Sequence, residues 1–350
     1  SPFHGCVNPE QYRQKVKQAE AACVIDFGLV AGIVVSVGDL PQLGKLVQMG
    51  ASYFKVFMPG NPPATPEVLW ESVKTAARTG LRLGIHAEEI ACLDAEVNWS
   101  DPLGFPSSRP YVAESSAVAQ VLEMAKAAGA PVHICHISAR QSAGLVATAK
   151  AQGVDVTAEV PPHFLLLDET EFTRQGPRVK TTPPLRTPAD NAALWQALDD
   201  GIIDALACDH FLGSLEPAPK DILKICDAAA GIASLELSLP LLYSTGVAEG
   251  RISLKRFVEV TSERPAEIGG VADRMGHITI GANADLIFID PEADWEVALQ
   301  GDFSRNNTSP YLGWQLHGRI KRTMVRGQTV WDGENITVKE GWGKHQPSQH

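Results

Sequence analysis

The segment that decides the fold is residues 81–137, which contain two short apolar runs, Leu81-Arg82-Leu83-Gly84-Ile85-His86 and Pro131-Val132-His133-Ile134-Cys135-His136-Ile137. Both runs are too short for helices and rich in Val, Ile and Leu, so they are predicted as strands. Between them, Ser115–Ala128 repeats apolar residues at helical spacing: Val118, Val121, Leu122 and Ala125. A strand, a helix and a second strand in this order predict a parallel βαβ unit.

The same alternation extends from about Ile33 to Leu206. Further strands are predicted at Gly32–Val37, Tyr53–Met58, Asp155–Val160 and Asp204–Cys208, and further helices at Pro66–Thr79, Ser142–Ala151 and Pro188–Leu198. Continuously apolar strands indicate a parallel sheet that is covered on both faces. No glycine-rich dinucleotide fingerprint follows any strand, so an α/β fold of the (β/α)8 TIM-like barrel type is favoured over a Rossmann sheet. Such a barrel has eight strands and six are counted, so the chain is expected to begin inside the fold, without the first strands.

The pattern changes after Arg251. One more helix is predicted at Ser253–Thr261, followed by short strands that look antiparallel: His277–Ile280, Ala284–Ile289, Ile320–Arg326 and Gln328–Trp331. The predicted organisation is therefore an N-terminally incomplete barrel hydrolase domain at residues 1–270, strands of a small β-sandwich module at residues 271–340, and a flexible polar tail at residues 341–350.

Composition excludes several classes of function. Hydrophobic residues make up 44% of the chain and charged residues 20%, as in ordinary globular proteins. Lys and Arg number 30 against 41 Asp and Glu, a net charge of −11, which argues against nucleic acid and anionic membrane surfaces as partners. No apolar stretch approaches the ~20 residues of a membrane span. Six scattered cysteines without a Cys-x-x-Cys pair, and no visible secretory signal, predict a cytoplasmic location.

Chemistry-bearing residues recur at the ends of the predicted strands. Lys55 lies within one strand, His86 and His136 end two others, and Asp209 follows a fourth. The carboxyl ends of barrel strands form one rim, so these side chains are predicted to converge. Singly, each has a simpler interpretation: an extended surface lysine, structural histidines and a helix-capping aspartate. Together they indicate first-row metal ligation, provided that CO2 carboxylates the lysine to an anionic carbamate.

Six motifs then narrow the interpretation: Phe54-Lys55-Val56-Phe57-Met58, Ile85-His86-Ala87-Glu88, His133-Ile134-Cys135-His136-Ile137-Ser138, Pro162-His163-Phe164-Leu165, Pro183-Pro184-Leu185-Arg186 and Asp209-His210. They resemble the cyclic amidohydrolases (allantoinase, dihydroorotase and hydantoinase/dihydropyrimidinase) of the metal-dependent amidohydrolase superfamily. The resemblance runs from about Val24 to Trp331. Gly231–Leu235 and Ser309–Gly313 look closer to allantoinases.

The resemblance implies a site and a reaction. Lys55, His86, His136 and Asp209 would hold one or two Zn²⁺ ions, or another divalent metal, with Lys55 carboxylated by CO2. A metal-activated water would open the ring of allantoin or a similar cyclic ureide, with Asp209 as general acid/base. The expected partner is thus a small cyclic ureide or amide. Homo-oligomers are expected, as in relatives.

Other positions match the motifs with less certain roles. Arg186, Thr182 and His163 would contact the substrate, although Arg186 is equally compatible with bracing its own loop. His133 and His210 would support the metal ligands from behind, through hydrogen bonds, without touching the ion.

One departure and two alternatives remain. The family's first strand carries a His-x-His pair, and none occurs here, so this chain is expected to bind at most one metal well and to be impaired, with an active full-length parent. The alternative activities are those of a dihydroorotase or a dihydropyrimidinase/hydantoinase. A non-catalytic scaffold paralogue is the alternative outside enzymes.

Overall fold

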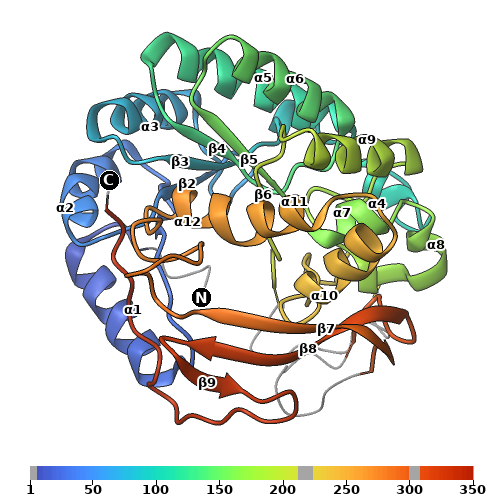
Figure 1. Cartoon of the computed structure of the whole chain (residues 1–350). Coiled ribbons are helices and arrows are strands. Elements are labelled where there is room, and N and C mark those ends of the chain that lie inside the picture. The colour runs from blue at the N-terminus through green and yellow to red at the C-terminus, as the bar shows by residue number, and fades with distance from the viewer. Residues whose placement is uncertain (1–5, 212–223, 299–307, 350) are drawn as a thin grey trace.

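The computed structural model describes residues 6–211, 224–298 and 308–349. Its centre is a six-stranded sheet in the order β1 to β6, in which all neighbouring strands are parallel (Figure 1). The strands are β1 (Ala31–Gly32), β2 (Phe54–Phe57), β3 (Leu83–His86), β4 (Val132–Ile134), β5 (Val156–Val160) and β6 (Ala205–Leu206). The predicted α/β, TIM-like architecture is therefore confirmed. Five predicted strand regions each contain one observed strand, whereas β1 shares only Gly32 with the predicted Gly32–Val37.

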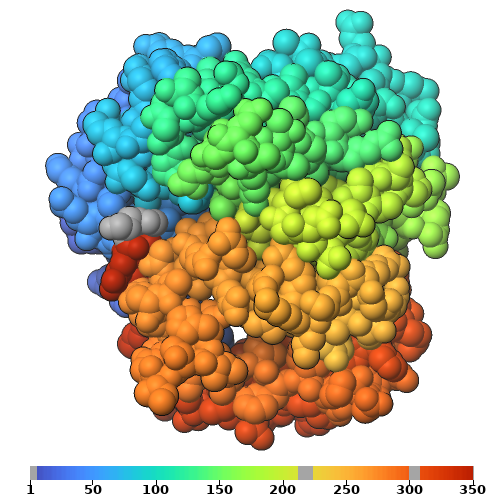
Figure 2. Space-filling model, turned by 45° about the horizontal axis from the view of Figure 1, so that its top comes forward, coloured from blue at the N-terminus to red at the C-terminus, as the bar shows by residue number. Residues whose placement is uncertain are grey.

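Helices cover the outside of this sheet. The long ones are α1 (Pro9–Ala22), α3 (Pro66–Thr79), α5 (Tyr111–Ala128), α6 (Arg140–Ala151) and α9 (Pro188–Asp199). Shorter ones lie in the connections: α2 (Leu43–Gln48), α4 (Gly104–Ser107), α7 (Pro162–Leu166), α8 (Glu171–Gln175), α10 (Ser238–Leu242), α11 (Leu254–Val258) and α12 (Arg264–Ile268). In the space-filling view, the segments after about residue 230 form one side of the molecule and the earlier strand–helix units the other (Figure 2).

The core lies between the sheet and these helices. Phe54 and Val56 on β2 and Leu83 and Ile85 on β3 are fully buried, and so is Val73 on the facing side of α3. Strands that are apolar on both faces are possible only where both faces are covered. The apolar runs in the sequence thus follow from the position of the sheet inside the molecule.

Helix α9 begins with a reciprocal cap. The hydroxyl of Thr187 accepts from the backbone N–H of Asp190 (3.4 Å), and the carboxylate of Asp190 accepts from the backbone N–H of Thr187 (3.2 Å). Pro188 occupies the first turn, where its missing N–H is not needed. The cap fixes the point at which the Pro183–Arg186 loop enters the helix.

We expect Thr187→Ala to lower the free energy of unfolding by about 1 kcal/mol, because it removes one half of this cap. Urea unfolding of the variant against the wild-type chain measures the change. Thr148→Ala, at an exposed position inside α6, is the matched control and should not destabilise the protein. Equal stability of the Thr187 variant and the wild type would contradict the expectation.

The C-terminal module differs in detail from the prediction. β7 (Leu286–Glu296), β8 (Gln315–Val325) and β9 (Gln328–Trp331) form one antiparallel sheet, and β7 is longer than expected. Residues 277–280, predicted as a strand, contain none. Within the described part of the chain the module is a single three-stranded sheet, so the second layer of a sandwich is not observed there.

The C-terminal segment is packed, contrary to the predicted flexible tail. Backbone bonds join Phe27 N–H to the Lys344 carbonyl (3.1 Å) and Ser348 N–H to the Gly50 carbonyl (3.0 Å). The Tyr12 hydroxyl of α1 lies 3.0 Å from Nε2 of His345. The polar composition of residues 341–349 was a poor guide because their partners lie far away in the sequence: backbone groups and the side chains of Tyr12, Asp26 and Arg274.

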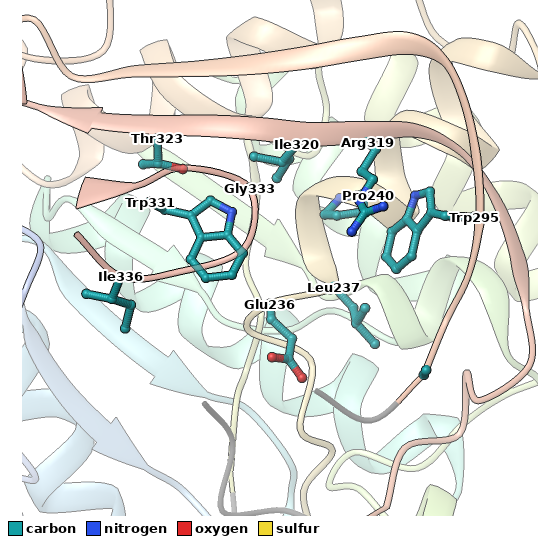
Figure 3. Close-up of a pocket in the computed structure, with 11 residues that line it drawn as sticks. Glu236, Leu237, Pro240, Trp295, Arg319, Ile320, Thr323, Trp331, Gly333 and Ile336 are labelled. Atoms are coloured by element: carbon teal, nitrogen blue, oxygen red, sulfur yellow. The ribbon is translucent and has the colours of Figure 1, made fainter. Parts of the chain in front are cut away.

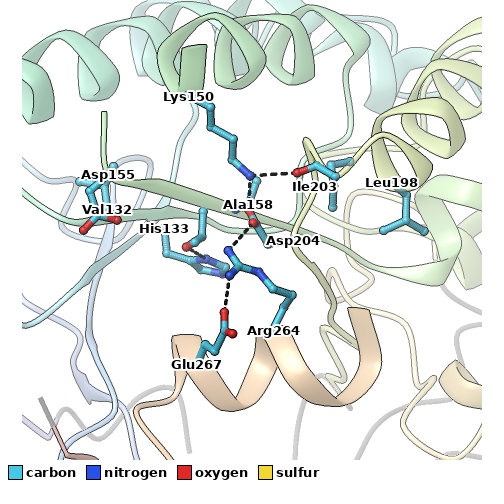
Figure 4. A network of polar contacts seen from close by, with 12 residues as sticks. Val132, His133, Lys150, Asp155, Ala158, Leu198, Ile203, Asp204, Arg264 and Glu267 are labelled. Atoms are coloured by element: carbon cyan, nitrogen blue, oxygen red, sulfur yellow. Dashed lines mark hydrogen bonds and ion pairs between the residues drawn. The ribbon is translucent and has the colours of Figure 1, made fainter. Parts of the chain in front are cut away.

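A buried carboxylate ties the start of β6 to two helices (Figure 4). Asp204, 2% exposed, is 2.7 Å from the Lys150 ammonium at the end of α6 and 2.9 Å from the Arg264 guanidinium of α12. It also accepts from the backbone N–H of Ala158 on β5 at 2.9 Å. One side chain thus joins two strands and two helices.

Candidate active site

The sheet brings the four predicted residues to the same end. Lys55 lies on β2, His86 is the last residue of β3, and His136 and Asp209 follow β4 and β6. The register pairs Lys55 with Gly84 and Phe57 with His86. Because all strands run in one direction, their carboxyl ends share one edge, which is where sites form in parallel α/β folds.

The side chains approach one another. The rings of His86 and His136 are edge to face with centroids 4.5 Å apart. The positive charge of Lys55 reaches both histidines and Asp209, where it favours neutral imidazoles and an ionised carboxylate. The structure thus brings His86 and His136 into contact and places Lys55 near both of them and near Asp209.

Both histidines are held in the neutral form. His86 is 3% exposed and His136 4% exposed. Burial lowers the pKa of each imidazole, and the positive charge of Lys55 lowers it further. Neutral imidazole is the form that binds metal ions.

The donor atoms at this site are of the kinds that bind metal ions. Nδ1 of His136 is buried without a hydrogen-bond partner, which is costly for a polar atom unless something else binds it. Nε2 of His86 is 2.6 Å from Glu88, so the other ring nitrogen is left for a cation. Imidazole nitrogens with a carboxylate suit zinc and its first-row neighbours.

Two of these residues have unusual backbone conformations. His136 has φ 38° and Asp209 has φ 45°, in the left-handed region that non-glycine residues rarely adopt. Such conformations concentrate at functional sites, where the surrounding structure holds them. Both side chains are thereby turned at the point where their strands end. Burial raises the pKa of Asp209 to about 7, partly opposed by Lys55.

Lys55 is surrounded by groups that favour its charge. Burial alone would lower the pKa of its ammonium, but the Cys135 thiol and the Glu159 and Asp209 carboxylates together raise it. Its Nζ also lies 5.0 Å from the centre of the Phe57 ring. Carboxylation of this amine remains a prediction.

A second polar group lies beside Lys55. Donor atoms of His133, Cys135 and Glu159 lie within 4.8 Å of one another. Both nitrogens of His133 are already engaged, Nδ1 by the Thr157 hydroxyl at 2.8 Å and Nε2 by Glu159 at 3.0 Å. Glu159 also faces the positive charge of Lys55. The polar atoms of His133 and Glu159 therefore already have partners within the protein, and we describe the group as a buried hydrogen-bond network inside the barrel.

Two nitrogens of the Arg186 guanidinium donate hydrogen bonds to the protein, whereas Nη2 is buried without a hydrogen-bond partner among the described residues. Nε donates to the Ser138 hydroxyl at 3.0 Å, Nη1 donates to the Arg109 carbonyl, and Nη2 lies 3.7 Å from Glu114. The bonds of Nε and Nη1 agree with the bracing interpretation, and the unpartnered Nη2 agrees with substrate binding, so both interpretations stand. Substrate binding by Arg186 stays a prediction.

The remaining predicted residues lie around the site. His163 is buried and close enough to His136 to add to the lowering of its pKa by burial. Nδ1 of His210 accepts from the backbone N–H of Leu235 at 3.3 Å, and Thr182 precedes Pro183 in the loop after Val179. The roles predicted for these three residues, and for His133, stay predictions.

Sequence reasoning assigned no role to Glu88 or Arg109. Glu88 is fully buried, and hydrogen bonds from His86 and Arg109 overcome the effect of burial and lower its pKa to about 2. The available signal was a charged residue two positions after a predicted ligand. Arg109 carries no such signal, because it lies 21 residues further along the chain.

A pocket lies away from the strand-end site. A cavity of about 290 Å³ opens between the β8–β9 sheet and the segment at Glu236 and Leu237, with Trp295, Arg319 and Trp331 in its wall (Figure 3). None of the four strand-end residues lines it. It is therefore separate from the candidate active site.

Among the described helices, none combines the length and apolar character needed to cross a bilayer.

Comparison with known proteins identifies a family match and several similar enzymes. Residues 46–330 match the family described as the Amidohydrolase family. A dihydroorotase of Geobacter sp. (strain M21) is 38% identical over 299 residues, covering 84% of this chain and 68% of the relative. An allantoinase of Solibacter usitatus (strain Ellin6076) is 32% identical over 336 residues, covering 92% and 72%. The solved L-hydantoinase (dihydropyrimidinase) from Arthrobacter aurescens superimposes with a TM-score of 0.91 at 30% identity, covering 97% of this chain and 77% of that one.

The match covers the parallel strand–helix sheet from β2 onward, with the histidines and the aspartate at its strand ends. The chain belongs to the amidohydrolase family.

Proposed function

We propose that the chain hydrolyses a C–N bond of a small cyclic amide or ureide at the strand-end site, with allantoin or a similar cyclic ureide as substrate. The observation that carries the proposal is the meeting of two neutral histidines, Asp209 and Lys55 at one edge of the sheet. The relatives named dihydroorotase, allantoinase and L-hydantoinase all bear names of cyclic-amide enzymes.

The residues of the chain have separate tasks in this proposal. His86, His136, Asp209 and carboxylated Lys55 would hold one or two divalent ions, zinc in the first instance. When bound, such an ion supplies Lewis-acid activation of water and of the amide carbonyl. Asp209 accepts a proton from the attacking water and returns it to the leaving nitrogen. Burial of the site excludes bulk water from competing for these groups.

We infer that the chain itself binds one ion well and turns over slowly. The predicted ligands are two histidines, one carboxylate and one lysine, which is close to the ligand number of a single ion. All six cysteines are free thiols, which supports a reducing, cytoplasmic location. Assembly into homo-oligomers belongs to the same proposal.

The relatives support dihydroorotase and dihydropyrimidinase/hydantoinase activities as alternatives. The sequence features that look closest to allantoinases favour allantoin. The gathering of the four residues argues against the non-catalytic scaffold, since a scaffold has no need to keep buried histidines neutral and one ring nitrogen without a partner.

We expect slow, zinc-dependent ring opening of one member of a panel comprising allantoin, hydantoin, dihydrouracil and dihydroorotate. The assay uses high enzyme concentration, chelator-treated protein, and protein reconstituted with zinc, with metal content measured in parallel. Chelation should abolish turnover and zinc should restore it. Absence of turnover on all four substrates by zinc-loaded protein would favour the scaffold alternative. Rapid turnover with two ions per chain would contradict the inferred impairment.

A further inference from the structure

The carboxylate of Glu88 is the most constrained polar group near the site. It lies 2.6 Å from Nε2 of His86, and it accepts from Arg109 twice, at 3.0 Å from Nε and 2.6 Å from Nη2. Its side chain is fully buried, so no water competes for these bonds. A bidentate arginine–carboxylate pair of this kind fixes the plane of the carboxylate as well as its charge.

This geometry determines which ring nitrogen of His86 carries the proton. An ionised carboxylate can only accept hydrogen bonds. Nε2 of His86 must therefore donate to Glu88, and a neutral imidazole with Nε2 protonated has its lone pair on Nδ1. Nδ1 makes no hydrogen bond to any described residue. The ring of His86 is thus held in one orientation, with the lone pair of Nδ1 available to bind a metal ion.

Arg109 is itself held by the segment that follows β5, which in turn contacts the segment that follows β4. Its backbone carbonyl accepts from Arg186, whose Nε donates to the Ser138 hydroxyl. Glu114 accepts from the backbone N–H groups of Ser138 (3.2 Å) and Ala139 (3.1 Å), shortly after His136. A continuous set of buried polar contacts thus connects the segment that carries His86 to the segment that carries His136.

We propose that Glu88, held by Arg109, is a positioning residue that fixes His86 in the Nε2-protonated form and so commits it to bind a metal ion through Nδ1. The proposal rests on the proposed function in taking His86 as a ligand. It adds that Nδ1 is the atom of His86 that binds the ion, and that Glu88 determines this choice. Carboxylates that accept from a ligand histidine typically change metal affinity by about 10- to 100-fold when they are replaced.

Substitution by glutamine is the sharpest test, because the new side chain would keep the volume of Glu88 and lose its acceptor-only character. Oε2 of Glu88 accepts from both Nε2 of His86 and Nη2 of Arg109, and Oε1 accepts from Nε of Arg109, so a glutamine amide cannot accept from all three donors. In the orientation that places its NH2 at the position of Oε2, the amide donates to Nε2 of His86, and the proton of the imidazole moves to Nδ1, the atom required by the metal. In the other orientation Nε of Arg109 loses its acceptor, so the carboxylate-like fork with Arg109 is broken. We expect Glu88→Gln to weaken zinc binding by about 10- to 100-fold in calorimetric titration.

The tautomer is measured directly on the metal-free chain. In ¹⁵N-histidine-labelled protein, the ring signals of His86, assigned by their loss in His86→Asn, should show a protonated Nε2 in the wild type. In Glu88→Gln a measurable share of the ring should be protonated on Nδ1. A wild-type ring protonated on Nδ1, or a tautomer unchanged by the substitution, would overturn the proposal.

Two further variants separate positioning from a general loss of folding. Glu123→Gln makes the same chemical change at an exposed position of α5 and should leave zinc affinity and tautomer as in the wild type. Arg109→Lys keeps the charge but loses the bidentate geometry, so zinc affinity should fall between wild type and Glu88→Gln. Loss of affinity in Glu88→Gln with an unchanged tautomer would count against positioning and indicate a general structural role.

The outcome is distinguishable from failure of the proposed function. A wild-type chain that binds zinc without hydrolysing any cyclic amide would remove the function and leave the tautomer and affinity results intact. Unchanged zinc affinity in Glu88→Gln would remove the positioning role and leave the proposed hydrolysis untouched.

Discussion

His136→Asn is expected to weaken zinc binding by more than about 100-fold, the upper end of what loss of an outer-sphere partner costs, because a donor is itself removed. Asparagine is the appropriate replacement since it tolerates the left-handed backbone that His136 adopts, with φ 38°. The turn after β4 should therefore persist while the imidazole is absent. Calorimetric titration of chelator-treated protein with zinc gives the affinity directly.

The control for this prediction is His317→Asn. His317 lies on β8 and is exposed; its ring pairs with Asp294, and its backbone N–H donates to the Ser244 hydroxyl, a bond that the substitution keeps. Its replacement removes the same imidazole without touching the strand-end site, so zinc affinity should stay at the wild-type value. Equal affinities of His136→Asn and wild type would mean that zinc binds elsewhere, and the strand-end metal site would be refuted.

Asp204→Asn should lower the free energy of unfolding by about 3 kcal/mol. The substitution leaves Lys150 and Arg264 without the carboxylate that both face. Breaking a fully buried ion pair costs more, but the side chains of Lys150 and Arg264 remain 25% and 39% exposed, and water can solvate them in part. The lost free energy comes from weaker attachment of α6 and α12 to the sheet.

Urea unfolding, with the thermal midpoint as a second readout, measures this loss. Asp199→Asn, exposed at the end of α9, is the matched control and should change stability by less than about 0.5 kcal/mol. Because Asp204 lies at the start of β6, zinc affinity should be unaffected. A variant as stable as the control would show that the two cations are equally well solvated without their partner.

Much of the barrel was predictable because its signals are local. Helix α3 begins and ends at the predicted residues, since Thr65 caps its first turn and Gly80 ends it in the left-handed conformation. Strands β2 and β3 fall within the predicted runs. The four strand-end residues could be named because a parallel sheet places the carboxyl ends of its strands together, whatever lies between them in the sequence.

What could not be predicted depends on contacts between distant residues. The pairing of Glu88 with Arg109 requires knowing how the segment between β3 and α5 folds back. The contacts of Arg186 with Ser138 and Glu114 require the same knowledge of the next two connections. The ends of β7 were missed because alternating polar residues continue the strand at the surface, where hydrophobic periodicity carries little information.

The packing of residues 341–349 against α1 has a consequence for biosynthesis. Ribosomes add residues from the N-terminus onward, so Tyr12 emerges 333 residues before its partner His345. Through most of translation, that surface of α1 has no final neighbour, and a molecular chaperone would find it available. Only when residues 341–349 leave the exit tunnel can these two distant parts of the nascent polypeptide be joined.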